Sequence, residues 1–285
     1  MRKKLLVLGA FVSVVMLVSC TGSKKEAVNY TPEEIADAGQ VVKYYDTSLA
    51  LLKNLVKERD VNAVLGYMEQ QAKVQMFSHI MSPVISKKDS AAVIQPGDYF
   101  GDDVRQNLIQ NYTELFQSRG QFYANFNKYL SLLKEKKTEG IADLLNDNYE
   151  LSVEMSECKQ NIFDILSPIV AQAQQVLLAE NPVKEQIIAM KKMSLTMQSI
   201  INQIYARKHV EDKVRLDLKI VELRLQLDAA EKLPAVKGHE EQMEKFKDFL
   251  SKTEKFMKIV QDIRQKNSYT EDDFDEISSY GLSII

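Results

Sequence analysis

The sequence predicts an all-α protein: an elongated bundle of about six amphipathic helices, with a long central helix or helix pair, behind a cleaved signal peptide. Three observations support this fold class. Apolar residues recur at spacings of three and four along most of the chain. Strand alternation and Asn-Gly hairpin signals are absent. Residues 183–233 contain neither Gly nor Pro, so a continuous helix there would run for about 75 Å.

The first helix is predicted to begin at Thr31 and to end near Glu58. Thr31 is a helix N-cap, Pro32 suits the first helical position, and Glu34 is placed to complete a capping box. A second helix starts at Asp60 and ends near Pro83, because proline lacks a backbone donor and clashes with the preceding turn. Apolar residues line one face of the first helix: Val41, Tyr45, Leu49, Leu52 and Val56.

The middle of the chain contains a predicted long loop followed by two long helices. Residues 86–102 are the longest predicted loop, either an ordinary connection or a displayed segment. The helix over 103–137 carries an aromatic stripe, which at this spacing indicates core more than a ligand-facing surface. In the helix after Gly140, Cys158 lies on the apolar face and is predicted to be buried, and Pro168 marks a kink or a stop.

Residues 183–233 form either one rod or two hairpin helices, because the apolar pattern fails over residues 207–212. The expected core face continues beyond this break through Val214, Leu218, Val221 and Leu225. Since Leu216, Ile220, Leu223 and Leu227 add a second apolar face, this half is expected to lie centrally in the bundle.

The last part of the chain contains a sixth predicted helix over residues 240–266 and a short acidic turn over 271–279. The acidic cluster of that turn is favoured as a helix N-terminal group over a cation site, because its spacing departs from the calcium loop. The apolar tail is expected to dock on the bundle and consists of Leu282, Ile284 and Ile285.

The first twenty residues combine a cationic head, an apolar run from Leu5 to Val18 and the tetrapeptide Leu17, Val18, Ser19, Cys20. The run is shorter than the roughly 20 residues that a spanning helix needs, and it has the proportions of a secretory signal peptide. The tetrapeptide resembles the lipobox of bacterial lipoproteins. An ordinary signal peptide with an accidental cysteine is the less favoured interpretation, because head, length and tetrapeptide agree.

The resemblance implies that Leu17, Val18 and Ser19 guide the signal peptidase and that the chain is cut before Cys20. It also implies that Cys20 carries a covalent diacylglycerol and an N-acyl chain, so the chain is held at a membrane. Thr21 stands where an Asp would retain such proteins at the inner membrane. The expected location is therefore the outer membrane, facing the periplasm.

These features divide the chain into a signal peptide (1–19), an acylated cysteine with a flexible tether (20–30) and a helical body (31–285), with two sub-bundles possible on either side of residue 182. Cleavage removes three basic residues and no acidic one, which leaves 34 basic and 40 acidic residues. This acidic balance predicts no nucleic-acid partner. Cys158 is then the one cysteine besides Cys20, so no intramolecular disulfide is expected.

The sequence contains no recognisable catalytic motif, phosphate-binding glycine loop or cysteine pair for a metal. No cofactor and no metal site are expected, and an enzyme is disfavoured. The body, with its Tyr-rich VVKYYDTSLALLKNL helix, resembles uncharacterised helical envelope lipoproteins. That resemblance carries no activity with it. The long amphipathic helices and the absence of catalytic signatures instead favour a non-enzymatic, lipid-anchored interaction or scaffold protein of the envelope, with an envelope protein as its partner.

Two alternatives remain open. One is a small-ligand or lipid-binding module whose pocket is walled by the Tyr-rich and Met-rich helices. The other is a hydrolase with a dispersed active site, which requires carboxylates clustered with His79, His209 or His239.

Overall fold

The protein is described here from a computed structural model, which places residues 29–69, 87–205, 213–266 and 270–280. Within these ranges the chain forms helices and no strands, so the all-α prediction is confirmed. No helix in this part is long and apolar enough to span a membrane. The helices are α1 (Pro32–Leu55), α2 (Glu58–Glu69), α3 (Lys87–Ile94), α4 (Asp102–Lys134), α5 (Ile141–Leu177), α6 (Lys184–Tyr205), α7 (Lys213–Ala230), α8 (Glu240–Gln265) and α9 (Glu271–Ser278).

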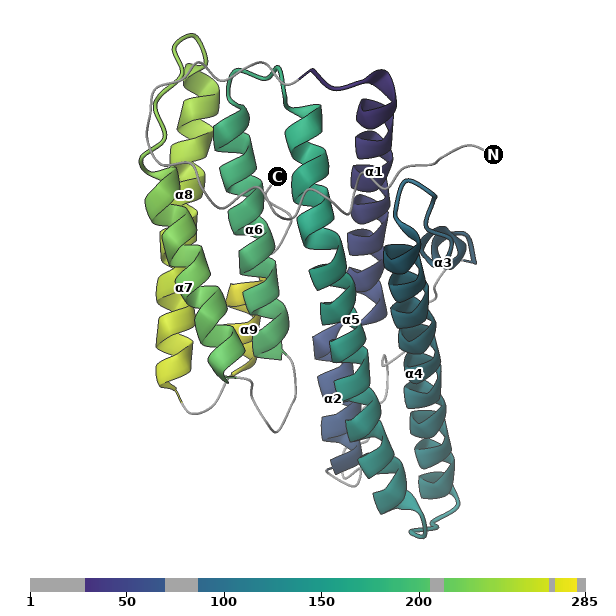
Figure 1. The fold of residues 1–285 in the computed structure, drawn as a ribbon. Coiled ribbons are helices and arrows are strands. Elements are labelled where there is room, and N and C mark those ends of the chain that lie inside the picture. Colours follow the sequence, from purple (N-terminus) through teal and green to yellow (C-terminus); the bar gives the residue numbers. More distant parts are fainter. Residues whose placement is uncertain (1–28, 70–86, 206–212, 267–269, 281–285) are drawn as a thin grey trace, which may run out of the picture.

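The helices surround two separate apolar cores. Buried residues from α1, α2, α4 and α5, with Val93 of α3, Phe100 and Leu195 of α6, make the first core. Residues from α6 to α9 make the second core. The two groups stand side by side and meet where α6 packs against α5 (Figure 1). The bundle is therefore elongated, as α4 and α5 extend well past the lower end of the second group in Figure 1.

The start of α1 has the predicted capping box. The Thr31 hydroxyl accepts a hydrogen bond from the Glu34 amide at 3.2 Å, and the Glu34 carboxylate accepts one from the Thr31 amide at 2.7 Å. Pro32 occupies the first turn, where its missing donor costs nothing. Between α4 and α5, Gly140 adopts φ 79°, a left-handed conformation that favours glycine. Both predicted helix boundaries therefore lie where local chemistry requires them.

The break between α1 and α2 is held by a buried arginine. Arg119 of α4 is 7% exposed, and its Nε donates to the carbonyl of Leu55 at 3.0 Å. Its guanidinium also lies 5.0 Å from the ring centroid of Tyr123. The last carbonyls of a helix lack intrahelical partners, so this contact satisfies one of them inside the core.

The aromatic stripe of α4 faces the first core, as predicted. Tyr112, Phe122 and Tyr129 are completely buried. The Tyr129 ring stacks with the Phe126 ring. It also meets the Tyr67 ring of α2 edge-on, with the Tyr67 and Tyr129 ring centroids 6.0 Å apart. Aromatic pairs in these geometries stabilise helix packing by more than the free energy expected from the apolar area that they bury.

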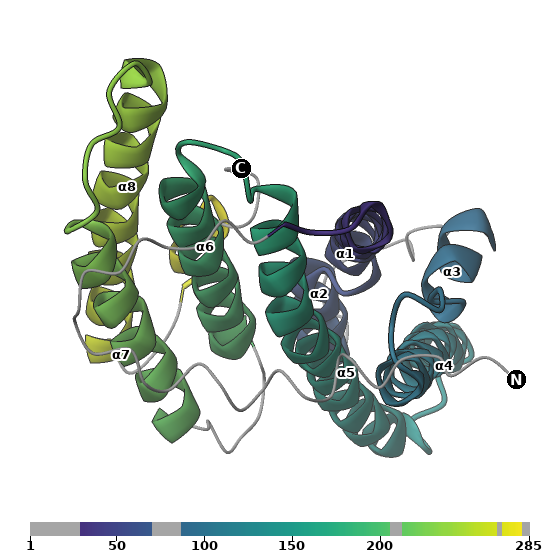
Figure 2. The ribbon, with the colours of Figure 1, turned by 45° about the horizontal axis from the view of Figure 1, so that its top comes forward.

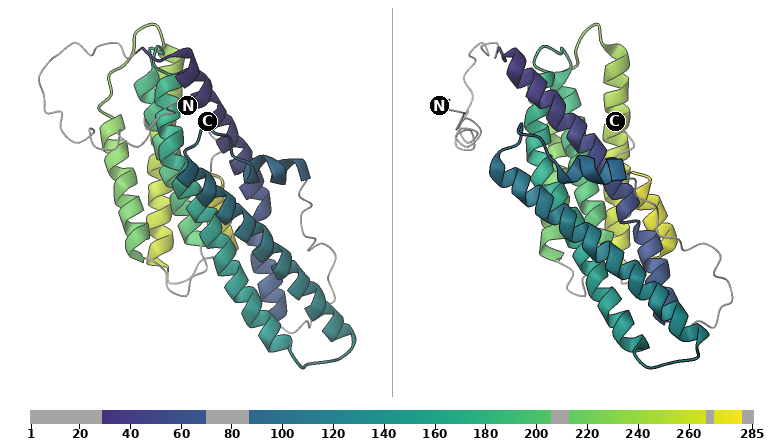
Figure 3. Two further views of the ribbon diagram at one scale, coloured as in Figure 1. Left: turned by 45° about the vertical axis from the view of Figure 1, so that its right-hand side comes forward. Right: turned by 90° about the vertical axis from the view of Figure 1, so that its right-hand side faces the viewer.

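One expectation about the middle of the chain is wrong, and of the two alternatives for Pro168, a kink or a stop, the stop is excluded. The predicted loop over 86–102 contains α3, which lies between α1 and α4 and contacts both (Figure 3). It is held there because Val93 is completely buried and the Val93 carbonyl accepts a hydrogen bond from the Tyr44 hydroxyl at 2.6 Å. Pro168 does not stop α5, which continues to Leu177. The residues that flank the proline, Leu166 and Val170, are buried in the first core, and this packing holds the helix on both sides.

The segment 183–233 forms two helices, α6 and α7, that pack against each other as neighbours. The predicted break at residues 207–212 lies outside the described residues. The expected central position holds for α6, which contacts α5, α7, α8 and α9. It is wrong for α7, which lies at an outer edge of the molecule (Figure 2).

The acidic turn after Thr270 is helix α9, and its acidic cluster has a structural role. Asp273 accepts hydrogen bonds from the Thr270 amide at 2.9 Å and from Lys266 Nζ at 2.7 Å. Lys266 and Thr270 together lower the pKa of the Asp273 carboxyl to about 2. The apolar tail that was expected to dock, Leu282, Ile284 and Ile285, lies outside the described residues.

Candidate interaction surface

The residues that the sequence singled out for lipid attachment are not among those that the structure describes. Leu17, Val18, Ser19 and Cys20 all fall in residues 1–28. The lipobox therefore stays a prediction, and the surfaces that the structure describes belong to the helical body.

The structure does not bring the three histidines together within the described ranges. His79 and His209 lie outside them, and His239 stands at the N-terminal end of α8. In the described part of the chain, no three His, Cys, Asp or Glu side chains are grouped so that they could hold a metal ion. The requirement of the dispersed hydrolase hypothesis is thus untested for two of its histidines.

Cys158 is buried on the inner face of α5, as predicted, with 3% of its surface exposed. Burial raises the pKa of its thiol to about 12, with smaller contributions from Glu114 and Glu154. Because the thiolate is the reactive form of cysteine, this side chain acts as a small core residue.

One hollow lies between the N-terminal ends of α6 and α8 and has a volume of about 200 Å³. Its lining includes Val183, Met190 and Met243. Ligand pockets are usually about 300–1,000 Å³, so this hollow is small for a drug-sized ligand.

The most unusual surface in the described residues is an apolar stripe along α7. It consists of Val214, Leu218, Val221 and Leu225, which are 70%, 64%, 56% and 64% exposed. The other large apolar side chains with high exposure, Ile35, Ile109 and Leu177, lie on three separate helices. Single exposed apolar residues are normal, whereas a contiguous row indicates a contact surface. We call these four residues the α7 stripe.

The sequence placed these four residues in the core, and the structure corrects this. α7 has two apolar faces but neighbours on one side, because it packs mainly against α6 and less extensively against α8. The face that it buries contains Leu216, Leu223 and Leu227. No signal in the sequence separates the two faces, because Leu216, Ile220, Leu223 and Leu227 recur at the same intervals of four, three and four residues as the stripe.

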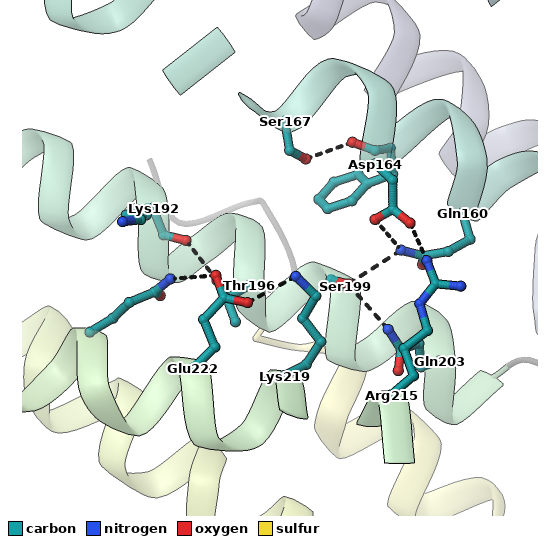
Figure 4. A network of polar contacts seen from close by, with 12 residues as sticks. Gln160, Asp164, Ser167, Lys192, Thr196, Ser199, Gln203, Arg215, Lys219 and Glu222 are labelled. Atoms are coloured by element: carbon teal, nitrogen blue, oxygen red, sulfur yellow. Dashed lines mark hydrogen bonds and ion pairs between the residues drawn. The ribbon is translucent and has the colours of Figure 1, made fainter. Parts of the chain in front are cut away.

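Two ion pairs link α7 to two other helices. Arg215 pairs with Asp164 of α5, and Asp217 pairs with Arg264 of α8. Figure 4 shows Arg215 reaching Asp164, whose carboxylate also accepts from Gln160 at 2.8 Å. The orientation of α7 is set mainly by the burial of Leu223 and Leu227 on its other face, and these partly exposed pairs add a smaller contribution.

A polar seam between α5 and α6 supports this arrangement. Gln160 is 8% exposed, and its Nε2 also donates to the Ser199 hydroxyl of α6 at 3.3 Å. Gln203 donates to the same hydroxyl at 3.5 Å (Figure 4). The two halves are thus joined by directional bonds next to the point where α7 is attached.

Substitutions on the two faces of α7 are expected to differ in their effect on stability. Leu223→Ala removes a completely buried side chain and should lower the free energy of unfolding by about 2–5 kcal/mol. Leu218→Gln changes an exposed side chain and should alter it by less than about 0.5 kcal/mol. Urea unfolding of the dilute protein measures both. Equal losses would show that the α7 stripe is buried.

Comparison with known proteins agrees with the helical fold. Residues 32–180 match the family described as a domain of unknown function (DUF6845), and residues 182–285 match the DUF3829-like, C-terminal domain. No curated protein matches the chain.

Two crystal structures are similar over most of the chain. An alpha helical protein from Bacteroides fragilis NCTC 9343 is 53% identical, with a TM-score of 0.81, over 88% of this chain and 98% of its own. An uncharacterized DUF3829-like protein from Bacteroides thetaiotaomicron VPI-5482 is 49% identical, with a TM-score of 0.77, over 89% of this chain and 100% of its own. The chain therefore belongs to the DUF6845 family of all-helical proteins and carries a DUF3829-like C-terminal domain.

Proposed function

We propose that this chain is a lipid-anchored, non-enzymatic interaction or scaffold protein of the bacterial cell envelope, and that the α7 stripe is its contact surface for a protein. The observation that carries the proposal is the exposure of four apolar side chains in one row. Fully burying a Val or Leu side chain stabilises a complex by about 1.5–3 kcal/mol relative to leaving it in water. A partner that covers the row recovers this free energy.

The charges beside the stripe favour a protein over a lipid surface as its partner. The four flanking residues are Arg215, Asp217, Glu222 and Arg224, two basic and two acidic. Helices that lie on anionic membranes carry an excess of Lys and Arg on their polar side. A balanced set of charges instead suits a second polypeptide with complementary signs.

The membrane attachment in this proposal rests on Cys20 and the three residues before it. Two or more acyl chains hold a protein stably at a membrane, whereas one chain binds marginally. The tether over residues 20–30 would keep the bundle within reach of the bilayer, and Thr21 favours the outer membrane facing the periplasm. The covalent lipid is the sole non-protein group that the proposal includes.

Lipid attachment is tested by metabolic labelling. Cells that express the full chain should incorporate radioactive palmitate into it, and Cys20→Ala should abolish the label, because the thiol is the attachment point. Cys158→Ala serves as the matched control and should keep the label. Label that persists in Cys20→Ala would overturn the lipobox assignment.

The contact surface is tested by photocrosslinking in living cells. A photoreactive amino acid at Leu218 of the full chain should give a crosslinked protein product. The same probe at Gln110, an exposed position on α4, should not. Product at Leu218 no greater than at Gln110 would contradict the proposed function, and peptide mapping of any product identifies what covers the stripe.

A further inference from the structure

The α7 stripe has the spacing of a coiled-coil seam. Its residues follow one another at intervals of four, three and four, which is the a and d pattern of a heptad repeat. From Val214 to Leu225 the row spans about 16 Å. An apolar row of this width and spacing is the surface onto which another α-helix packs.

The charged residues along the two edges of the stripe indicate which helix that is. In the heptad, Arg215 and Glu222 occupy the e positions on one edge, and Asp217 and Arg224 occupy the g positions on the other. Each edge thus carries one positive and one negative side chain. When two copies of such an edge run antiparallel, each positive side chain faces a negative one of the other copy.

We propose that the α7 stripe binds the α7 stripe of a second copy of this chain, with the two helices antiparallel about a two-fold axis. This inference rests on the proposed function, since it names the partner of that contact surface. Leu218 then lies opposite Val221 of the second copy, and Val214 lies opposite Leu225 of the second copy. The interface is isologous, as in most homodimers.

The antiparallel register pairs opposite charges along both edges. Antiparallel coiled coils bring e positions opposite e positions and g positions opposite g positions. Arg215 therefore faces Glu222 of the second copy, and Asp217 faces Arg224 of the second copy. By symmetry each of these pairs occurs twice.

A parallel pair places like charges together instead. Parallel coiled coils set each g position against the e position of the next heptad. Asp217 would then face Glu222 of the second copy, again twice. Like charges at these positions disfavour the parallel arrangement and select the antiparallel one.

Three of the four charged side chains already have ion-pair partners within the chain and stay partly exposed. Arg215, Asp217 and Glu222 are 44%, 48% and 42% exposed while they pair with Asp164, Arg264 and Lys219. The charges therefore set direction and register, and burial of the four apolar side chains supplies most of the affinity.

This seam is small beside the roughly 800 Å² per partner of a standard protein interface. Attachment of both copies to one membrane raises their effective concentration, so a weak contact suffices there. A two-fold axis perpendicular to α7 also has a geometric consequence. When the two-fold axis is perpendicular to the membrane, both α7 helices lie parallel to the membrane plane. The tethers of the two copies then reach the same membrane.

The test is disulfide formation between full-length chains in cells. Val214→Cys and Leu225→Cys chains with different tags are co-expressed and exposed to an oxidant. The antiparallel pair predicts a mixed disulfide. Each variant alone should give no disulfide dimer, because residue 214 lies about 16 Å along the axis from its own counterpart and a disulfide needs Cα atoms within about 7 Å. The unsubstituted chain, with Cys20 and the buried Cys158, sets the background.

Each other outcome overturns the inference in a distinguishable way. Disulfide dimers of Val214→Cys alone would show a parallel pair. No mixed disulfide, together with a photocrosslink from Leu218 to a different protein, would reject the second copy and leave the proposed function standing. No mixed disulfide and no protein crosslink would reject both. A crosslink from Leu218 to another part of the same chain would show that the stripe is covered internally.

A charge variant tests the register separately from the apolar contact. Arg224→Glu places two acidic side chains opposite each other at both g positions and should lower the yield of mixed disulfide by roughly threefold or more. Lys252→Glu makes the same charge change at an exposed position on α8 and should leave the yield unchanged. Equal yields in Arg224→Glu and Lys252→Glu would contradict the register.

Discussion

The arrangement of this molecule depends on one packing constraint: α7 has two apolar faces, and the chain supplies neighbours for one of them. Leu216, Leu223 and Leu227 point into the second core, while the α7 stripe faces outward. Burial of these leucines contributes most to this orientation, and the partly exposed ion pairs of Arg215 and Asp217 contribute less. The exposed row is thus a consequence of how α7 is held.

The rest of the bundle provides the rigid support that this surface requires. The first core is organised by the aromatic side chains of α4, and the buried contact of Arg119 with Leu55 fixes the junction of α1 and α2 against it. The polar seam of Gln160 and Ser199 then joins α5 to α6 in a defined register. Because α7 packs on α6 and reaches α5 through Arg215, its orientation is set by both halves of the chain.

Local chemistry made much of the fold predictable. The Thr31 capping box and the left-handed Gly140 locate helix ends, and the aromatic spacing identifies the inner face of α4. The loop prediction over 86–102 failed because it depended on tertiary contacts: helix α3 exists because the first core receives Val93. Tertiary contacts also decide against a stop at Pro168, since its flanking residues are buried.

The candidate surface was missed for a related reason. Hydrophobic periodicity reports that a face is apolar, and it cannot report whether a neighbouring helix covers that face. Both faces of α7 satisfied the helical pattern, so the sequence placed both inside. The lipobox could be proposed from sequence alone because its residues act in order along the chain and need no fold.

Coverage of the α7 stripe is measured by the rate at which a thiol reagent labels it in intact envelopes. If a second copy covers the stripe, Val221→Cys reacts roughly tenfold more slowly than Lys232→Cys, an exposed position beyond the end of α7, and the difference disappears when the protein is solubilised and diluted. Equal labelling rates in the intact envelope would contradict the claim that the α7 stripe is a covered contact surface.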